Sequence, residues 1–155
     1  DDLADGLRIE RGASRYLRPV ELLDDRRLLR GINEIGEAGK RIRLILAVGA
    51  DNRVIGVRVV SHKETPGLGD YIDPRKDRNK AAPWIRQFDA TGFERVAAAD
   101  WKVNKDGGKF DARAGATISA RAVTNATRQA LQFAVDHRDK LYALPAQSRL
   151  EKEAP

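Results

Sequence analysis

Two hydroxyl side chains, Thr117 and Ser119, directly follow the small residues Gly115 and Ala116 in the segment DARAGATISARAV, residues 111–123. Apolar residues recur at helical spacing after them, so a helix is expected to begin near Ser119. Either hydroxyl could cap the free backbone N–H groups of the first turn, which is the commoner role of such residues. The alternative is an anion site, because free N–H groups and the positive end of the helix dipole favour a phosphate.

The anion-binding hypothesis does not match either common nucleotide motif. No Gly-Lys-Ser/Thr follows the glycine, which excludes a Walker loop. The three-glycine spacing of a dinucleotide-binding turn is also absent. Gly115 and Ala116 would instead let the backbone approach a ligand closely, and Arg121 could add a charge-assisted contact.

The stretch SHKETPGLGD, residues 61–70, is a second candidate site. Pro66 restricts the chain there, whereas Gly67 and Gly69 permit tight or positive-φ backbone. Leu68 either folds back onto the core or is presented, together with backbone amides, to a flat ligand. The sequence of the loop leaves both possibilities open.

Acid–base and metal chemistry have little support from the residue types. His62 and Glu64 could form an acid–base pair, but no third partner is evident. The chain has no cysteine and two histidines, which excludes disulfides, thiolate metal sites and cysteine nucleophiles and disfavours a histidine-rich metal site. A hydrolase is therefore the least favoured function.

The net charge of +6 over 155 residues favours anionic partners. The positive charge is scattered, however, and the longest basic cluster, DPRKDRNK at residues 73–80, contains two aspartates. Nucleic-acid binding is therefore not expected. No apolar run approaches the roughly 20 residues of a membrane span. Because the sequence contains no methionine, we expect a fragment or a processed product.

An α+β fold, a single domain over residues 1–155, is expected to position these sites. Turn residues separate four apolar segments that favour an antiparallel meander, at residues 15–23, 26–35, 41–49 and 53–62. A helix over residues 20–35 is the alternative for the first two segments. A C-terminal helix at residues 118–136 is expected to pack its alanine stripe on this sheet. The other expected features are a long loop at 63–84, a helical turn at 84–88, a short strand and turn at 101–111 and a loose tail after residue 144.

Taken together, the motifs resemble one known family. The pattern HKETPGLGD, then Trp84 and Phe88, then WKVNKDGG-FD and GATIS-RAV, is similar to the G subunit of the Rnf electron-transport complex. It is similar, more distantly, to the C subunit of the sodium-pumping NADH:quinone oxidoreductase. The resemblance runs in order from about Ile42 to Leu131, well over half of the chain.

The resemblance implies a covalent flavin. In this family the pattern Asp-x-x-Ser/Thr-Gly-Ala-Thr carries FMN through a phosphoester to its final threonine, and a flavin transferase makes the bond from FAD with a divalent metal. Asp111 matches the motif aspartate and Thr117 the attachment site. Ala114 departs from the usual Ser or Thr, which removes one hydroxyl contact, and Ser119 stands where many members have Thr.

The resemblance also implies which residues surround the flavin. The ring is expected to pack on the loop, with Thr65 and Leu68 as its principal contacts. The full set of expected cofactor-binding residues is Glu64, Thr65, Gly67, Leu68, Asp111, Gly115, Ala116, Thr117, Ile118 and Ser119. Neither catalytic residues nor metal ligands are expected.

The function implied is electron transfer without independent turnover. The chain would be the soluble, periplasmic domain of a subunit anchored in the bacterial inner membrane by one N-terminal helix absent from this sequence. Its partners would be the other subunits of a complex that links ferredoxin and NAD to ion movement, and the flavin transferase during maturation. Two alternatives are the same FMN domain in another respiratory or regulatory membrane protein, and a basic binding module without a cofactor.

Overall fold

The computed structural model describes residues 20–23, 26–35, 41–143 and 149–150. Five antiparallel strands form one sheet in the order β4-β3-β2-β1-β5. Their bounds are β1 (Val20–Leu23), β2 (Arg26–Ile35), β3 (Arg41–Val48), β4 (Val54–Ser61) and β5 (Arg149–Leu150). Strands β1 to β4 follow one another as a meander, so the predicted meander is confirmed and a helix over residues 20–35 is excluded. Residues 15–19 of the first predicted strand lie outside the described residues.

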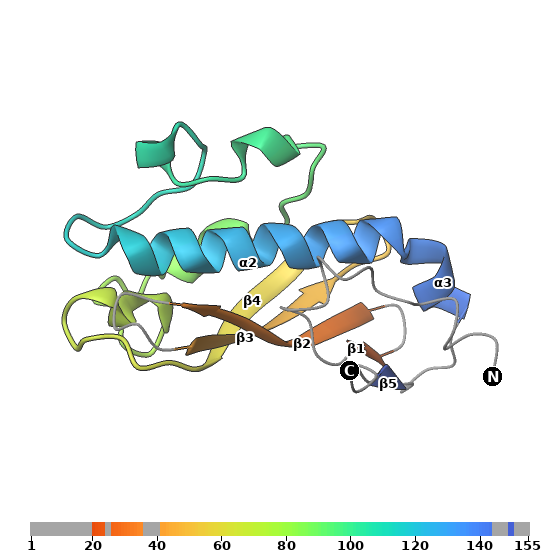
Figure 1. Cartoon of the computed structure of the whole chain (residues 1–155), viewed down its shortest axis with the longest axis horizontal. Coiled ribbons are helices and arrows are strands. Elements are labelled where there is room, and N and C mark those ends of the chain that lie inside the picture. Colours follow the sequence, from red (N-terminus) through yellow and green to blue (C-terminus); the bar gives the residue numbers. More distant parts are fainter. Residues whose placement is uncertain (1–19, 24–25, 36–40, 144–148, 151–155) are drawn as a thin grey trace.

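The helix α2 (Thr117–Asp136) crosses one face of this sheet (Figure 1). It contacts β2 and β3. Ile42, Leu44, Leu46 and Val48 are buried because alternate side chains of β3 point to the same face. Small side chains on α2 let the helix approach the sheet closely, and buried ones among them are Ala120, Ala126, Ala130 and Ala134. The predicted α+β architecture is therefore confirmed.

Two parts of the C-terminal region differ from the prediction. The chain turns at His137 into a second short helix, α3 (Arg138–Ala143), which the sequence pattern did not indicate. The tail is also not wholly loose, because residues 149–150 form β5 and pair with β1. Within the described residues, no helix is long and apolar enough to cross a membrane.

Strand β4 contains two extra residues that break the simple alternation seen in its sequence. The pairing with β3 shifts across Ile55 and again across Val60. Because of the first shift, Val54 lies on the same buried face as Val57 and Val59. Ile55 and Val60 consequently remain 44% and 56% exposed.

The segment between β4 and α2 contains four 3₁₀ helices and an aromatic cluster. The helices are η1 (Gly69–Ile72), η2 (Trp84–Phe88), η3 (Ala98–Asp100) and η4 (Asn104–Asp106). The predicted helical turn at 84–88 is confirmed as η2. The cluster stabilises this long connection by burying large side chains, and its members are Tyr71, Trp84, Phe88, Trp101 and Phe110.

The predicted strand and turn at residues 101–111 are reduced to one bridge. Val103 and Phe110 form an isolated β-bridge around η4, and Gly107 adopts a φ of 87° after it. Gly108 must be a glycine, because a Cβ there would lie 1.9 Å from the carbonyl oxygen of Lys102.

Candidate functional site

The N-terminus of α2 has no side-chain cap. Ala116 occupies the N-cap position, and no side chain of the described residues accepts a hydrogen bond from the first-turn N–H groups. The capping interpretation of Thr117 and Ser119 is therefore wrong. Thr117 is the first helical residue and is half-buried. The free N–H groups and the dipole of a 20-residue helix are left to attract an anion.

Ser119 is used in a different way, because its hydroxyl joins the helix to the loop. Ser119 Oγ donates a hydrogen bond to Glu64 Oε2 at 2.7 Å, and both residues are buried. Tyr71 makes a second link by donating from its hydroxyl to the carbonyl oxygen of Ala116, also at 2.7 Å. The loop at residues 64–69 and the start of α2 therefore lie side by side, although about fifty residues separate them in the sequence.

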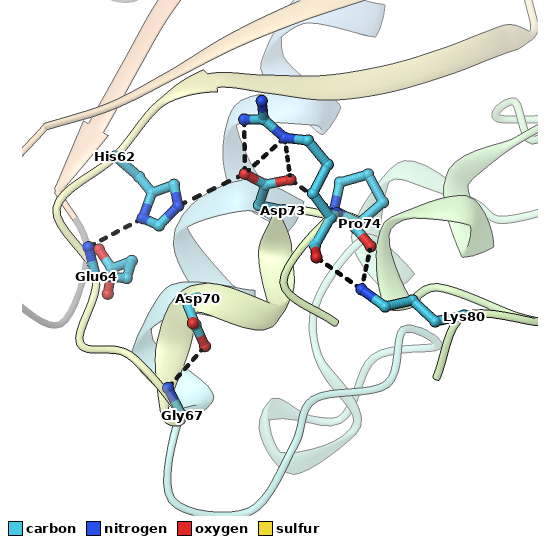
Figure 2. Close-up of polar contacts among 8 residues, drawn as sticks. His62, Glu64, Gly67, Asp70, Asp73, Pro74 and Lys80 are labelled. Carbon is cyan, nitrogen blue, oxygen red and sulfur yellow. Dashed lines mark hydrogen bonds and ion pairs between the residues drawn. The ribbon is translucent and has the colours of Figure 1, made fainter. Parts of the chain in front are cut away.

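The loop presents Leu68 to solvent. A turn closed by the bond from Leu68 N to Thr65 O holds the loop, and Gly67 N donates to Asp70 Oδ1 at 3.1 Å (Figure 2). Gly67 has a φ of 77°, which favours glycine. The side chain of Leu68 is 52% exposed, so it does not fold back onto the core. This geometry leaves Leu68 free to contact a ligand.

A pocket of about 360 Å³ separates the loop from the segment that precedes α2. Gly67, Leu68 and Tyr71 line it on the loop side, and Arg113 and Ala114 line it on the other. Lys76 and Arg78 add two further positive charges, whereas Asp70 adds one negative charge. The pocket is therefore basic, and its lining reaches Ala114, three residues before the start of α2.

An ion pair between a buried carboxylate and a partly exposed arginine fixes the segment that leads into Gly115. Asp77 is fully buried and lies 2.6 and 2.9 Å from the two terminal nitrogens of Arg113. Asp77 also accepts hydrogen bonds from the backbone N–H groups of Trp84 at 2.6 Å and Asn79 at 3.0 Å. The guanidinium of Arg113 lies over the ring of Tyr71, 5.2 Å from its centroid. None of these three side chains was expected at the site from the sequence, in which Asp77 was noted only as one of two aspartates in the basic cluster at residues 73–80.

The side chain of Asp111 points away from the Asp77–Arg113 pair and toward η4. Its Oδ1 accepts a hydrogen bond from Asn104 Nδ2 at 2.7 Å, and the residue is exposed. Its backbone is bound by Gln87 and Trp84 of η2. Within the described chain no hydrogen bond joins its carboxylate to Thr117. The structure thus brings the loop and residues 113–119 together, and leaves the Asp111 carboxylate facing η4.

Comparison with known proteins identifies the family. Residues 38–132 match the model of the FMN-binding domain. The chain belongs to the FMN-binding domain family. This domain spans both motifs of the site, and FMN is the cofactor for which the family is named.

Curated relatives agree with the resemblance found in the sequence. The G subunit of the ion-translocating oxidoreductase complex is 47% identical to this chain over 102 residues in Pseudomonas aeruginosa and 45% identical over 104 residues in Aliivibrio fischeri. The protein of the same name in Cereibacter sphaeroides is 44% identical over 111 residues. These matches cover 66%, 67% and 71% of this chain, and 45%, 47% and 48% of the relatives. The chain thus spans about half the length of the curated relatives it matches.

The family's cofactor fits the residues at the start of α2. A phosphate beside Thr117 would meet the free N–H groups of the first turn. Gly115 has a φ of 82°, and no atom other than those of its chain neighbours lies within 4 Å of the position that a Cβ would take, so the space beside Gly115 is open. The basic pocket beside Ala114 adds favourable electrostatics for an anionic cofactor.

The side chain of His62 supports the loop by bonding to the backbone of Glu64. Its Nδ1 accepts a hydrogen bond from Glu64 N at 3.1 Å, and its Nε2 lies 3.9 Å from Asp73 Oδ2 (Figure 2). The contact between His62 and Glu64 does not involve the Glu64 carboxylate, which bonds to Ser119 instead. The arrangement orients the loop and gives no support to an acid–base pair.

Asp73 should stabilise this region in a pH-dependent way. The side-chain hydrogen bonds from Arg75 hold the pKa of the buried Asp73 carboxyl below its ordinary value of 3.8. We expect Asp73→Asn to lower the free energy of unfolding by about 1–2 kcal/mol at pH 7. Because the folded-state pKa is depressed, the contribution is complete above the ordinary pKa and is lost as pH falls through the folded value. Urea unfolding at pH 7 and near pH 2.5 measures the difference, and an undiminished effect at the acidic pH would contradict it.

Proposed function

We propose that this chain is the FMN-carrying domain of a subunit of a membrane-bound, ion-translocating oxidoreductase complex, with FMN joined covalently to Thr117. The observation that supports this most directly is the uncapped start of α2, where Thr117 occupies the first helical position. The names of the relatives support the assignment to such a complex. The complex would link ferredoxin and NAD to ion movement, and the domain would lie on the periplasmic side of the inner membrane.

Attachment of the flavin would be a group transfer from FAD. The Thr117 hydroxyl oxygen would form a bond to the phosphorus of the FMN half, the pyrophosphate bridge would break, and AMP would leave while the hydroxyl proton is released. A flavin transferase with a divalent metal would catalyse this step. Half-burial of Thr117 leaves it accessible to such an enzyme, whereas Ser119 is fully buried.

Once bound, FMN supplies one- and two-electron redox chemistry, and the protein supplies position and electrostatics. The phosphodiester would keep one negative charge, which the first-turn N–H groups of α2 would bind. Leu68 and Thr65 would contact the ring, because the loop lies beside the helix start and Leu68 is exposed. The bond from Ser119 to Glu64 would hold these two parts of the site at a fixed separation.

Other expected contacts have less specific roles. Gly67, Gly115 and Ala116 would let the backbone approach the cofactor, and Ile118 would shield it, since its side chain is 49% exposed. Asp111, in the segment before α2, would take the role of the motif aspartate while the flavin is attached. The departure at Ala114 would remove one hydroxyl contact to the phosphate. Covalent attachment suits a carrier that passes electrons on and releases no product.

The proposal is tested by producing the chain with a flavin transferase in an extracytoplasmic compartment. We expect the whole-protein mass to rise by one FMN less one water, and the yellow colour to stay with the denatured chain. The loaded protein should be reduced and reoxidised reversibly, and should not oxidise NADH by itself. Flavin that dissociates on denaturation, or a chain that takes up none, would contradict the proposal.

A further inference from the structure

A larger cleft lies on another face of α2, between the helix and the segment containing η3 and η4. Figure 1 shows this segment above α2 and the sheet below it. The cleft has a volume of about 580 Å³, within the usual range of small-molecule sites. It shares no lining residue with the basic pocket at Leu68, and Ile118 is the single expected flavin contact that lines it.

The walls of the cleft are apolar in part. Trp101, 1% exposed, forms part of the wall, and Ala98, Ala99 and Ala122 extend it. The indole Nε1–H of Trp101 donates to the carbonyl oxygen of Val96 at 2.6 Å, which fixes the ring. A flat or branched apolar body could therefore pack against an ordered surface.

The polar side of the cleft carries excess positive charge. Arg121 forms a two-point ion pair with Asp106 at 2.6 and 2.9 Å, and its hydrogen bonds lower the pKa of the Asp106 carboxyl. The lining thus holds three cations, Lys102, Arg121 and Arg128, against one anion, and it keeps excess positive charge although Asp106 attracts Lys102 as well as Arg121. Arg128 donates to Asn125 Oδ1 at 2.7 Å, so its guanidinium is oriented by a neutral group.

Thr124 supplies an independent sign of a missing ligand. It lines the cleft and is 1% exposed, yet its Oγ1 has no hydrogen-bond partner among the described residues. Thr127, equally buried on the same helix, satisfies its hydroxyl by donating to the carbonyl oxygen of Val123 at 2.8 Å. A buried polar group left unpaired costs on the order of 1–3 kcal/mol.

We propose that this cleft is a second ligand site, separate from the flavin, which binds a small amphipathic organic anion such as an aromatic or branched carboxylate. The apolar body packs against Trp101 and the alanines. The carboxylate lies between Lys102 and Arg128, and an acceptor atom takes the hydrogen bond that Thr124 can donate. The excess positive charge of the lining disfavours a neutral ligand.

The probe is naphthalene-2-carboxylate, with the neutral naphthalene-2-carboxamide as its matched control. The chain contains two tryptophans, so its two indole N–H signals in an NMR titration report separate places. Trp101 lines the cleft, whereas Trp84 lies outside it and donates to the carbonyl oxygen of Asp111. We expect a saturable shift of the Trp101 signal with the carboxylate, and at least tenfold weaker binding of the carboxamide. No saturable shift, a shift of Trp84 alone, or equal affinity for the two probes would overturn the proposal.

Variants locate the site more closely. Arg128→Gln and Lys102→Gln should each weaken carboxylate binding about tenfold, whereas Arg95→Gln, an exposed arginine outside the cleft, should not. Thr124→Val should weaken binding several-fold without lowering the unfolding midpoint, because it removes an unpaired hydroxyl. Unaltered NMR spectra of the variants without ligand would establish that they fold. Unchanged affinity in both charge variants would refute the assignment.

A final experiment tests whether this site is distinct from the place that the flavin occupies. Binding of the carboxylate should be the same in flavin-loaded protein and in Thr117→Ala. Loss of binding only on flavin loading would mean that the tethered cofactor occupies the cleft, and would overturn a second site. The absence of covalent flavin from the wild-type chain would instead refute the proposed function and leave the carboxylate titration to be judged by itself.

Discussion

Thr117→Ala should abolish covalent flavin loading, whereas Ser119→Ala should retain it. The structure supplies a physical reason for the difference. Thr117 is half-buried at the first position of α2, where the N–H groups of the first turn have no side-chain cap. The hydroxyl of Ser119 is fully buried and already donates to Glu64. Thr124 and Thr127 lie further along the helix, where the N–H groups are used within the helix.

The measurement is whole-protein mass after production with a flavin transferase, together with in-gel flavin fluorescence. Ser119→Ala should lose some stability, because it leaves the buried Glu64 carboxylate without the Ser119 hydroxyl. If Ser119→Ala still carries covalent flavin, the result will also show that reduced stability does not by itself prevent loading. Flavin retained in Thr117→Ala and lost in Ser119→Ala would move the attachment site to Ser119. Covalent flavin retained in both variants would contradict attachment to a hydroxyl at this helix start.

Asp77→Ala should be among the most destabilising single substitutions in the described chain. It would leave the Arg113 guanidinium without its buried partner and remove the acceptor of two backbone N–H groups. Because Arg113 stays 35% exposed, most of the cost comes from the two backbone N–H groups left without their acceptor, and we expect about 2–4 kcal/mol. The cost should appear as a lower urea midpoint, and hydrogen exchange should accelerate at residues 113–116, which the pair anchors beside the flavin site.

Asp139→Ala is the matched control, because its carboxylate is 97% exposed and pairs with Arg138 at the surface. We expect it to change the free energy of unfolding by less than about 0.5 kcal/mol. The double variant Asp77→Ala with Arg113→Gln should be less destabilised than the sum of the single variants, since each one alone removes the same interaction. Additive effects would show that the two side chains act independently.

Local patterns in the sequence were sufficient to predict much of the fold. Period-two alternation and regularly spaced turn residues predicted the meander, and apolar spacing predicted α2. The extra residues at Ile55 and Val60 could not be predicted in this way, because alternation assumes one residue for each step of the partner strand. Helix α3 and strand β5 were missed because each is short.

The candidate site shows the same limit more clearly. The resemblance implied that one flavin would contact both the loop and the start of α2, which requires the two to lie close together, and the bond between Glu64 and Ser119 shows that they do. The same bond explains why Ser119 does not cap the helix, because its partner lies 55 residues earlier in the chain. Asp77 and Arg113 are 36 residues apart, and no local pattern distinguishes their buried pair from surface charge.

The irregular pairing of β4 bears on how these domains behave when many copies are crowded together. An open sheet edge can recruit a strand from another molecule, and β4 is such an edge. Its N–H and C=O groups are out of step at Ile55 and Val60, and the N–H of Val54 is already bonded to Thr91. An incoming strand would find regular spacing over only the short stretch between the two irregularities, where Arg58 faces solvent. The edge is thereby protected against polymerisation, even though it carries two exposed aliphatic side chains.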